Sequence, residues 1–429
     1  MQHKEKLIDN IHQEKTENLF KTLYGGSQDI ISSQTQRYID LVSSFDSVFP
    51  ERDSVSFFST PGRSEIGGNH TDHNAGRVLA AAVNLDIIAA VSENNRNEIV
   101  IESDGFENFT VNLSGLSMIE SEINTSGALV RGVCARMKEL GYEIGGFDAA
   151  FMSSVPNGSG LSSSAAFEVL IVTILDHLYN GNIIAPLTRA YIARYAENNY
   201  FGKPCGLMDQ ATCSAGGFVS IDFRDFDNPV VKKIEYDFSS RGYSLAIVNT
   251  NGSHADLTDD YAAIKNEMID VAQALGGDVL REFSKEYILD NIPILRSKIS
   301  DRAILRALHF YADNQRVVEQ VSALEQDNPD EFMRLIIESG NSSWMMCQNC
   351  YTAKAVNDQP VSIALAISKS ILKGKGAWRV HGGGFAGTIQ AFVPNELKEV
   401  YFNKMREIFG QDSCYDLSIR PEGSIKLDI

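Results

Sequence analysis

The stretch Pro156–Ala166 decides the fold of this chain, because it is a loop of small residues that leads directly into a helix. In order, it consists of Pro156, Asn157, Gly158, Ser159, Gly160, Leu161, Ser162, Ser163, Ser164, Ala165 and Ala166. Residues 146–155 alternate apolar side chains and are expected to form a strand, whereas the residues after the loop repeat apolar side chains at helical spacing. The loop therefore joins a strand to a helix.

The chemistry of this loop favours binding of a phosphate group. Gly158 and Gly160 allow the backbone to approach an anion, and the serines offer hydroxyl and N–H groups where a helix begins and its dipole attracts negative charge. No Gly-Lys-Ser or Gly-Lys-Thr occurs in the chain, so the loop is not of the Walker A type. The alternative is a plain serine-rich cap of the helix.

Two further segments carry unusual composition. Residues 61–74 crowd polar and charged side chains between two apolar runs, in the order Pro-Gly-Arg-Ser-Glu-Ile-Gly-Gly-Asn-His-Thr-Asp-His-Asn. Residues 381–388, His-Gly-Gly-Gly-Phe-Ala-Gly-Thr, lie between two apolar runs and predict a strand, a glycine turn and a second strand. Such crowding of polar residues indicates a functional site.

In this order and at roughly this spacing, the three segments resemble the three motifs of the GHMP kinases, which are small-molecule kinases that use ATP. Within that family they are most similar to galactokinases. The resemblance extends from about Phe57 to the C-terminus and includes Cys205–Gln210, Tyr261 and Arg306–His309. It implies an α+β fold of two domains, with mixed sheets, helices packed on one face and the active site in the cleft between the domains.

The length of 429 residues also favours two domains, and 43% hydrophobic residues are sufficient for a core in each. We expect a helical extension over residues 1–50, an N-terminal domain over 51–235 and a C-terminal domain over 236–429. Residues 78–91 are very apolar but contain Asn84 and Asp86. They are too short for a membrane helix and are expected to form a pair of buried strands.

The net charge of −18 argues against a nucleic acid or an anionic membrane as a partner. The six cysteines are scattered, the N-terminus has no apolar export segment, and Cys347 and Cys350 lack the further ligands of a zinc site. These features predict a cytoplasmic protein with reduced thiols. The oligomeric state stays open, as a monomer or a weak dimer.

The resemblance implies which residues bind ATP and Mg²⁺. The phosphate loop would be formed by Gly158, Ser159, Gly160, Leu161, Ser162, Ser163 and Ser164. Ser164 and Glu197 would hold Mg²⁺, for which oxygen ligands are suited, and Ser103 would lie near the nucleotide base. From local pattern alone, Glu197 could instead be a surface ion-pair partner.

Asp209 is the expected catalytic residue, with Arg63 as its partner in the resemblance. A permanent guanidinium charge would keep the carboxyl ionised and could stabilise the phosphoryl group in transfer. Asp209 would then accept the proton of the acceptor hydroxyl, as a true base or as an orienting group. Local pattern alone also allows Asp209 to cap the helix that follows.

The resemblance assigns sugar contacts to Asn69, His70, Thr71, Asp72, Gly206 and Tyr261. The family pattern Gly-Arg-Val-Asn-Leu-Ile-Gly-Glu-His-Thr-Asp-Tyr-Asn departs from this chain at Ser64, Glu65, Ile66, Gly67, Asn69 and His73. Asn69 replaces a glutamate expected on the C6 side of the sugar, exchanging a pure acceptor for an amide. Selectivity at C6 is therefore open.

Three functions are compatible with these motifs. The first is an ATP-dependent kinase that phosphorylates the anomeric hydroxyl of galactose, or of a related sugar altered at C6 or C2. The second is a non-catalytic regulator that binds galactose and ATP. The third is a family member with a non-sugar acceptor such as mevalonate or homoserine. Arg63, Asp209 and the serines at 162–164 argue against the second, and the resemblance of residues 70–72 and 208–210 to sugar-type elements argues against the third.

Overall fold

The computed structural model describes residues 2–103, 108–156, 160–252, 257–385 and 387–429. Two compact units are present, and neither is a single stretch of chain. The first comprises residues 1–63, 82–217 and 420–429, and the second comprises residues 64–81 and 218–419. These units differ from the linear division at residues 50 and 235, because residues 64–81 and the C-terminal segment pack with parts of the chain remote in sequence. The linear division stays a prediction.

A mixed sheet forms the centre of the first unit, in the strand order β12–β1–β2–β5–β3–β4. The strands are β1 (Ser56–Gly67), β2 (Arg77–Glu93), β3 (Glu98–Ser103), β4 (Phe109–Asn112), β5 (Phe147–Ser153) and β12 (Ile425–Leu427). The expected strand pair over residues 78–91 is wrong, since β2 runs through it unbroken. Its side chains are buried on both faces, so no polar alternation marks an end.

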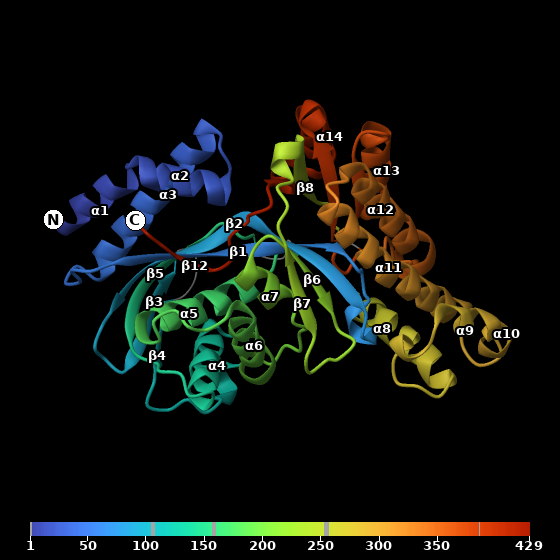
Figure 1. Cartoon of the computed structure of the whole chain (residues 1–429), viewed down its shortest axis with the longest axis horizontal. Helices are drawn as coiled ribbons and strands as arrows, with labels where there is room; N and C mark the ends of the chain where they lie inside the picture. Colours follow the sequence, from blue (N-terminus) through green and yellow to red (C-terminus); the bar gives the residue numbers. More distant parts are fainter. Residues whose placement is uncertain (1, 104–107, 157–159, 253–256, 386) are drawn as a thin grey trace. The chain divides into compact units, whose positions relative to one another are not determined.

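Helices cover both faces of this sheet (Figure 1). On one face lie α4 (Ser126–Glu139), α5 (Ser163–Tyr179), α6 (Pro186–Ala196) and α7 (Met208–Ala215). The predicted N-terminal extension supplies the other face, with α1 (Gln2–Ile11), α2 (Glu14–Tyr24) and α3 (Gln28–Val48). Phe20, Tyr38 and Leu41 of this extension are fully buried and pack with Phe57 and Ile88 of the sheet.

Asp86 ties the N-terminal helices to the sheet and to the C-terminal segment. Its carboxylate is fully buried and accepts hydrogen bonds from Arg37 Nη1 at 2.5 Å, Arg420 Nη1 at 3.0 Å and Tyr24 Oη at 2.7 Å. Burial raises the pKa of this carboxyl, but the charges of Arg37 and Arg420 outweigh that effect and lower it. The polar residue within the apolar run is thus a buried ionic anchor.

The second unit contains a sheet with the strand order β11–β8–β10–β9. Its strands are β8 (Tyr243–Asn249), β9 (Ala377–His381), β10 (Thr388–Pro394) and β11 (Cys414–Leu417). Residues 77–81 of β2 pair separately with β6 (Phe218–Asp222), which pairs with β7 (Val230–Ile234). The helices are α8 (Thr258–Ala274), α9 (Lys285–Asp290), α10 (Ile292–Leu295), α11 (Asp301–Glu325), α12 (Pro329–Ser342), α13 (Pro360–Leu372) and α14 (Lys398–Phe409).

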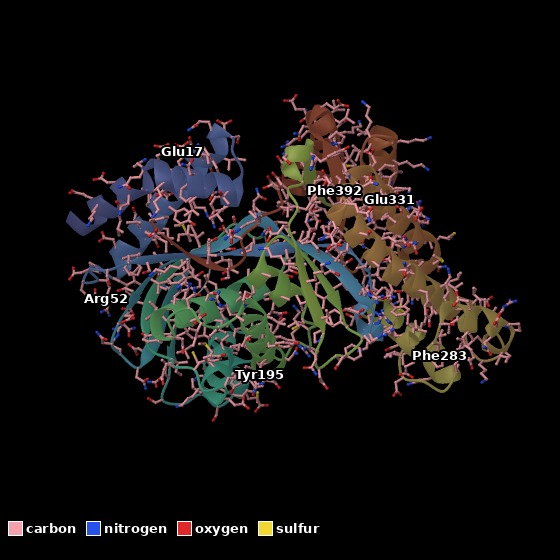
Figure 2. The ribbon with its side chains drawn as sticks, viewed as in Figure 1. Glu17, Arg52, Tyr195, Phe283, Glu331 and Phe392 are labelled. Atoms are coloured by element: carbon pink, nitrogen blue, oxygen red, sulfur yellow. The ribbon has the colours of Figure 1, made fainter. Side chains whose placement is uncertain are left out.

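Alternate residues of β10 pack in different directions, as expected for a strand buried on both faces. Ile389, Ala391 and Val393 join α13 and α14 in one apolar cluster. Phe392, labelled in Figure 2, lies instead against Phe238 and Phe332, with ring centroids 5.0 and 5.5 Å away. Within the described part of the chain, no helix combines the length and apolarity needed to cross a membrane.

The replacement Asp86→Asn is expected to destabilise the protein strongly. It leaves Arg37 and Arg420 without their shared carboxylate in a buried site, which costs about 3–5 kcal/mol of unfolding free energy. Urea unfolding measures this loss of unfolding free energy. The control variant is Asp53→Asn, which removes the same charge from an exposed loop. Because the pKa of Asp86 is lowered, the carboxylate loses its charge only in acid. The difference in unfolding free energy between wild type and Asp86→Asn should therefore decrease below about pH 4. Equal effects of the two substitutions would contradict the anchor.

Candidate functional site

The end of the phosphate loop is attached to strand β1. The backbone N–H of Arg63 donates to the carbonyl of Leu161 at 3.0 Å, and the Arg63 guanidinium donates to the carbonyl of Gly160. A Cβ on Gly62 would lie 2.7 Å from the Leu161 carbonyl oxygen, so only glycine allows this approach. Gly158 and Ser159 lie outside the described residues. The described part of the loop, residues 160–164, is held by the strand that carries Arg63.

Arg63 and Asp209 form a two-pronged ion pair. Arg63 Nε donates to Asp209 Oδ1 at 2.8 Å and Nη2 donates to Oδ2 at 2.6 Å. The Ser162 hydroxyl also donates to Oδ2. Burial raises the pKa of the Asp209 carboxyl, but the Arg63 charge and the Ser162 hydrogen bond outweigh it, so the pKa lies below its usual value. Asp209 is therefore held ionised, with 31% of its side chain exposed.

The local structure argues against plain capping roles for these residues. Ser162 precedes α5 in a left-handed conformation with φ of 58°, and its side chain does not cap that helix. The hydroxyl serves Asp209 instead. Asp209 stands in the first turn of α7, after Leu207 at the N-cap position, and its carboxylate is directed to Arg63 and Ser162. The side chains of Ser162 and Asp209 therefore bind each other and Arg63 at the end of the loop, and neither caps a helix.

Ser164 and Glu197, the two predicted metal ligands, are in direct contact, and their role as ligands stays a prediction. The Ser164 hydroxyl donates to Glu197 Oε1 at 3.1 Å, and Glu197 begins a π-helical turn over residues 197–201 that ends at Gly202. Glu197 is 2% exposed. Lys203 Nζ donates to Oε1 at 3.2 Å and Gln210 Nε2 donates to Oε2 at 2.7 Å. Glu197 is thus a buried carboxylate that forms an ion pair with the exposed Lys203.

A second buried carboxyl group, Glu168, lies behind this pair and was not predicted. Gln210 Nε2 also contacts Glu168 Oε2 at 3.3 Å, whereas Glu168 Oε1 and Gln210 Oε1 are buried without a hydrogen-bond partner. Burial and the negative charge of Glu197 raise the pKa of Glu168 well above its usual value. Ser164 and Glu168 are one helical turn apart, so their spacing in the sequence indicates that they lie on the same face of α5. That Glu168 is buried beside Glu197 and Gln210 is evident only from the structure.

These oxygens fit a small divalent cation that keeps part of its water shell. One hydroxyl and one buried carboxylate are a hard donor set, and Mg²⁺ is usually held by only one or two protein carboxylates. The oxygens Glu168 Oε1 and Gln210 Oε1 lie buried beside them without a hydrogen-bond partner. Among the described residues, no group of three or more His, Cys, Asp or Glu side chains forms a metal site.

A cavity of about 320 Å³ opens beside the start of α5. Ser103, Ser163 and Ser164 line it together, so the predicted base-binding serine and the end of the phosphate loop share one pocket. The rest of the lining is Ile87, Phe109, Asn124, Ser126, Leu129, Phe151, Ser153, Phe167 and Phe201. Apolar and aromatic side chains with a few polar groups are typical of a small-molecule pocket.

The predicted sugar turn belongs to the second unit. Gly68 has φ of +81°, and a Cβ there would lie 2.2 Å from the carbonyl oxygen of Arg77. The buried Thr71 hydroxyl contacts the carbonyls of Gly68 at 2.8 Å and Arg77 at 2.6 Å, which closes the turn internally. Thr71 therefore holds the backbone of the turn.

Within this turn the predicted contact residues differ in exposure. Asn69 is 1% exposed, whereas His70 and Asp72 are both partly exposed. His70 has φ of 58°, and its Nε2 donates to the carbonyl of Gly383 at 3.2 Å. Burial lowers the pKa of the neighbouring His73 to about 4, so that imidazole is neutral at physiological pH. Among the predicted sugar-contact residues of this turn, His70 and Asp72 are therefore the ones with partly exposed side chains.

The glycine turn of the third motif supports the sugar turn through its carbonyl groups. Gly382 accepts from Asn69, Gly383 accepts from His70, and Gly384 accepts from Tyr261 Oη at 3.1 Å. Tyr261 also packs edge-on against Phe385, with centroids 5.2 Å apart. Ala386 of the same motif lies outside the described residues. In the first unit, Gly206 is exposed, three residues before Asp209.

Replacing Arg63 with methionine should raise the pKa of the Asp209 carboxyl above its usual value. The substitution removes the charge that outweighs burial and keeps most of the side-chain volume. Titration of ¹³C-labelled aspartate by NMR measures the change, with Asp225 as an exposed internal reference. Ser162→Ala should raise the pKa less, since it removes one neutral hydrogen bond. An unchanged pKa in Arg63→Met would refute the pairing.

Comparison with known proteins adds to this geometry. Residues 43–93 match the family model described as the galactokinase galactose-binding signature, and residues 128–217 match the GHMP kinases N-terminal domain. Among solved structures, a Lactococcus lactis galactokinase complexed with galactose has a TM-score of 0.74 at 24% identity, covering 93% of this chain and 100% of the other.

Curated relatives are more similar in sequence. A galactokinase of Glaesserella parasuis is 34% identical over 352 residues, which cover 79% of this chain and 85% of the relative. A galactokinase of Actinobacillus pleuropneumoniae is 34% identical over 353 residues, with the same shares covered. At this identity and coverage, the chain belongs to the galactokinase family of GHMP kinases.

Proposed function

We propose that the protein is a kinase that transfers the terminal phosphoryl group of ATP to the anomeric hydroxyl of galactose. One observation carries the proposal: a partly exposed carboxylate, Asp209, is kept ionised beside the phosphate loop by Arg63 and Ser162. Phosphoryl transfer mainly requires positioned reactants and neutralised charge. Arg63 and Asp209 offer both a cation and a group that can orient a hydroxyl.

We propose that the nucleoside of ATP occupies the cavity lined by Ser103 and Ser163. The aromatic walls of that cavity, including Phe109 and Phe151, support a planar base. The phosphates would follow the loop from Gly158 to Ser164, where backbone N–H groups and the start of α5 favour anions. No lysine is required in the loop, because Arg63 supplies a cation at its end.

Ser164 and Glu197 are the proposed holders of Mg²⁺, with Gln210 and Lys203 orienting the Glu197 carboxylate. When bound, the ion would neutralise phosphate charge. Lys203 is 61% exposed, so its ammonium can leave Glu197 for solvent or a phosphate oxygen. The contribution of these residues is thus to present one oriented carboxylate oxygen and one hydroxyl oxygen.

In the proposed reaction, a carboxylate oxygen of Asp209 accepts the hydrogen bond of the sugar hydroxyl and finally its proton. The lowered pKa keeps that oxygen available as an acceptor, although it makes the carboxylate a weak base. Such a base is sufficient if the proton leaves late, as in a loose transition state. Arg63 holds the carboxylate in place and offers positive charge near the transferring group.

For the sugar we propose contacts to His70, Asp72 and Tyr261, together with the backbone of Gly206. His70 and Asp72 are partly exposed, and a carboxylate with an imidazole can bind several hydroxyls. Two other functions remain as outcomes of the tests. A non-catalytic regulator would bind galactose and ATP without turnover, and a kinase for another acceptor would ignore galactose. We also propose a cytoplasmic location, which the six free cysteines support.

Coupled measurement of ADP release tests the function. The acceptors are galactose, N-acetylgalactosamine, 6-deoxygalactose, arabinose and glucose, with mevalonate and homoserine as non-sugar acceptors. We expect sugar-dependent ADP release with the highest kcat/KM for galactose. A higher kcat/KM for 6-deoxygalactose or arabinose would assign a related sugar, and no sugar-dependent release would refute the kinase.

Asp209→Asn should lower kcat by about a hundredfold or more, because an amide cannot take the proton. The affinity for galactose should change far less. Asp227→Asn, which removes the same charge from an exposed turn, is the control and should leave kcat unchanged. Turnover of folded Asp209→Asn within tenfold of wild type would remove Asp209 from the chemistry.

Glu197→Gln should raise the Mg²⁺ concentration needed for half-maximal activity by about tenfold or more, since it replaces the proposed carboxylate ligand. The KM for the sugar should stay near the wild-type value. The exposed Glu143→Gln is the matched control. Calorimetric titration of Mg²⁺ with ADP gives a second readout without turnover, and an unchanged Mg²⁺ requirement in both assays would exclude Glu197 as a ligand.

A further inference from the structure

Glu65 and Asn69 lie next to each other at the start of the sugar turn. Their side chains are exchanged relative to the family pattern, which has asparagine at the first position and glutamate at the second. Asn69 Nδ2 donates to Glu65 Oε1 at 3.0 Å, so the two exchanged residues contact each other directly. The exchange is thus one structural feature and not two independent substitutions.

The side-chain amide of Asn69 has no hydrogen-bonding capacity left. Its Nδ2 donates to Glu65 and to the carbonyl of Gly382, the latter at 2.8 Å. Its Oδ1 accepts from Asn349 Nδ2 at 2.9 Å and from the Ser343 hydroxyl at 3.3 Å. An amide has two donors and two acceptor sites, and all four are used. With the residue 1% exposed, the amide has no group to offer a sugar hydroxyl.

The backbone of Asn69 is fixed as well. Its N–H donates to Asp313 Oδ2 at 2.9 Å, and its carbonyl accepts from His309 Nε2 at 2.9 Å. Asp313 and His309 are fully buried on α11. Asn69 therefore connects α11, the glycine turn and the residues after α12. It directly precedes the partly exposed His70 in the sequence.

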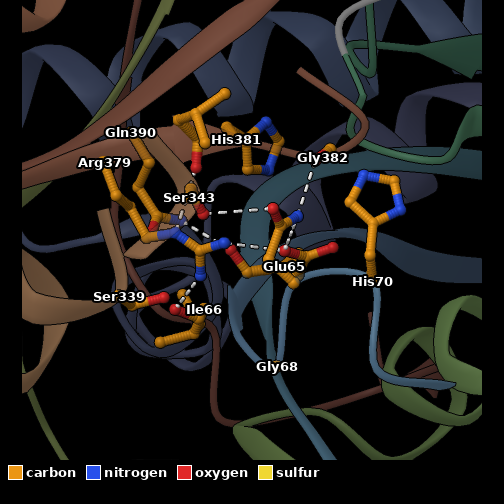
Figure 3. Close-up of polar contacts among 12 residues, drawn as sticks. Glu65, Ile66, Gly68, His70, Ser339, Ser343, Arg379, His381, Gly382 and Gln390 are labelled. Atoms are coloured by element: carbon orange, nitrogen blue, oxygen red, sulfur yellow. Dashed lines mark hydrogen bonds and ion pairs between the residues drawn. The ribbon is translucent and has the colours of Figure 1, made fainter. Parts of the chain in front are cut away.

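The charge of this cluster is balanced around Glu65. Arg379 is fully buried, and its Nη2 donates to Glu65 Oε1 at 2.9 Å while its Nη1 donates to the carbonyl of Ile66 at 2.6 Å (Figure 3). A carboxylate at position 69 would lie beside that of Glu65 and against the carbonyl of Gly382. Both contacts are repulsive, so the site accepts an acid at position 65 or at position 69 but not at both.

We propose that Asn69 is a positioning residue that fixes His70 and Asp72 and does not itself contact the sugar. This inference rests on the proposed function and changes the role expected of Asn69. Discrimination between sugars then depends on other groups of the site. Loss of the Asn69 amide weakens binding of every accepted sugar by the same factor, because it loosens the turn and removes no contact to a particular hydroxyl.

The first test is a mutant cycle of Asn69→Asp, Glu65→Gln and the double variant, followed by thermal unfolding without ligands. Asn69→Asp should lower the melting temperature by about 5 °C, since it leaves the Gly382 carbonyl unpaired and places two carboxylates together. The double variant should lose less than the sum of the single losses, because the glutamine amide removes the repulsion and can donate to the introduced aspartate. Additive losses would overturn the paired arrangement. Asn341→Asp, on the exposed side of α12, is the control and should not shift the melting temperature.

The second test compares galactose with 6-deoxygalactose as acceptors for wild type, Asn69→Ala and Asn69→Asp. The positioning role predicts a higher KM for both sugars and a ratio of their kcat/KM values within about twofold of wild type, because no sugar contact is lost. A tenfold change in that ratio would overturn the inference. If wild type phosphorylates neither sugar, the proposed function fails, whereas the unfolding cycle still tests the Glu65 and Asn69 pairing.

Discussion

The ion pair between Arg63 and Asp209 is the constraint on which the arrangement of the phosphate loop and helix α7 depends. It joins strand β1, which also binds the phosphate loop, to helix α7. A partly buried carboxylate without this cation would be protonated more easily and would lose its value as an acceptor. Ser162 adds a hydrogen bond to the same carboxylate from the end of the loop, so the loop and the Asp209 carboxylate are positioned together.

The second unit contains a turn that is held by internal hydrogen bonds and leaves a few polar side chains partly exposed. Its internal hydrogen bonds consume the side chains of Asn69 and Thr71, and the glycine turn of the third motif contributes three carbonyl groups. A rigid turn discriminates between hydroxyl patterns better than a flexible one, because mispaired groups cannot adapt. The residues after α12, Ser343 and Asn349, complete this support from a distant part of the sequence.

Much of the fold was predictable because apolar residues recur in the sequence at the regular spacing of strands and helices. The strand expected over residues 146–155 and the helix expected after the phosphate loop are present as β5 and α5. The prediction of two strands over residues 78–91 was wrong because Asp86 does not break the strand. Its carboxylate is buried and paired with Arg420, which is 334 residues away in sequence. The family motifs indicated Arg63, Asp209, Ser164 and Glu197, whereas the buried Glu168 and the exposed Lys203 join the Glu197 cluster only through tertiary neighbours. The internal role of the Asn69 amide was hidden for the same reason, since its partners lie up to 313 residues away.

The most direct measurement is ³¹P and ¹³C NMR of the product formed from ATP and galactose labelled with ¹³C at C1. If Asp209 acts on the anomeric hydroxyl, the labelled carbon should show coupling to the phosphorus of a sugar phosphate, and one ADP should form for each such product. A phosphate ester at another carbon, or ADP formed without any sugar ester, would contradict the account.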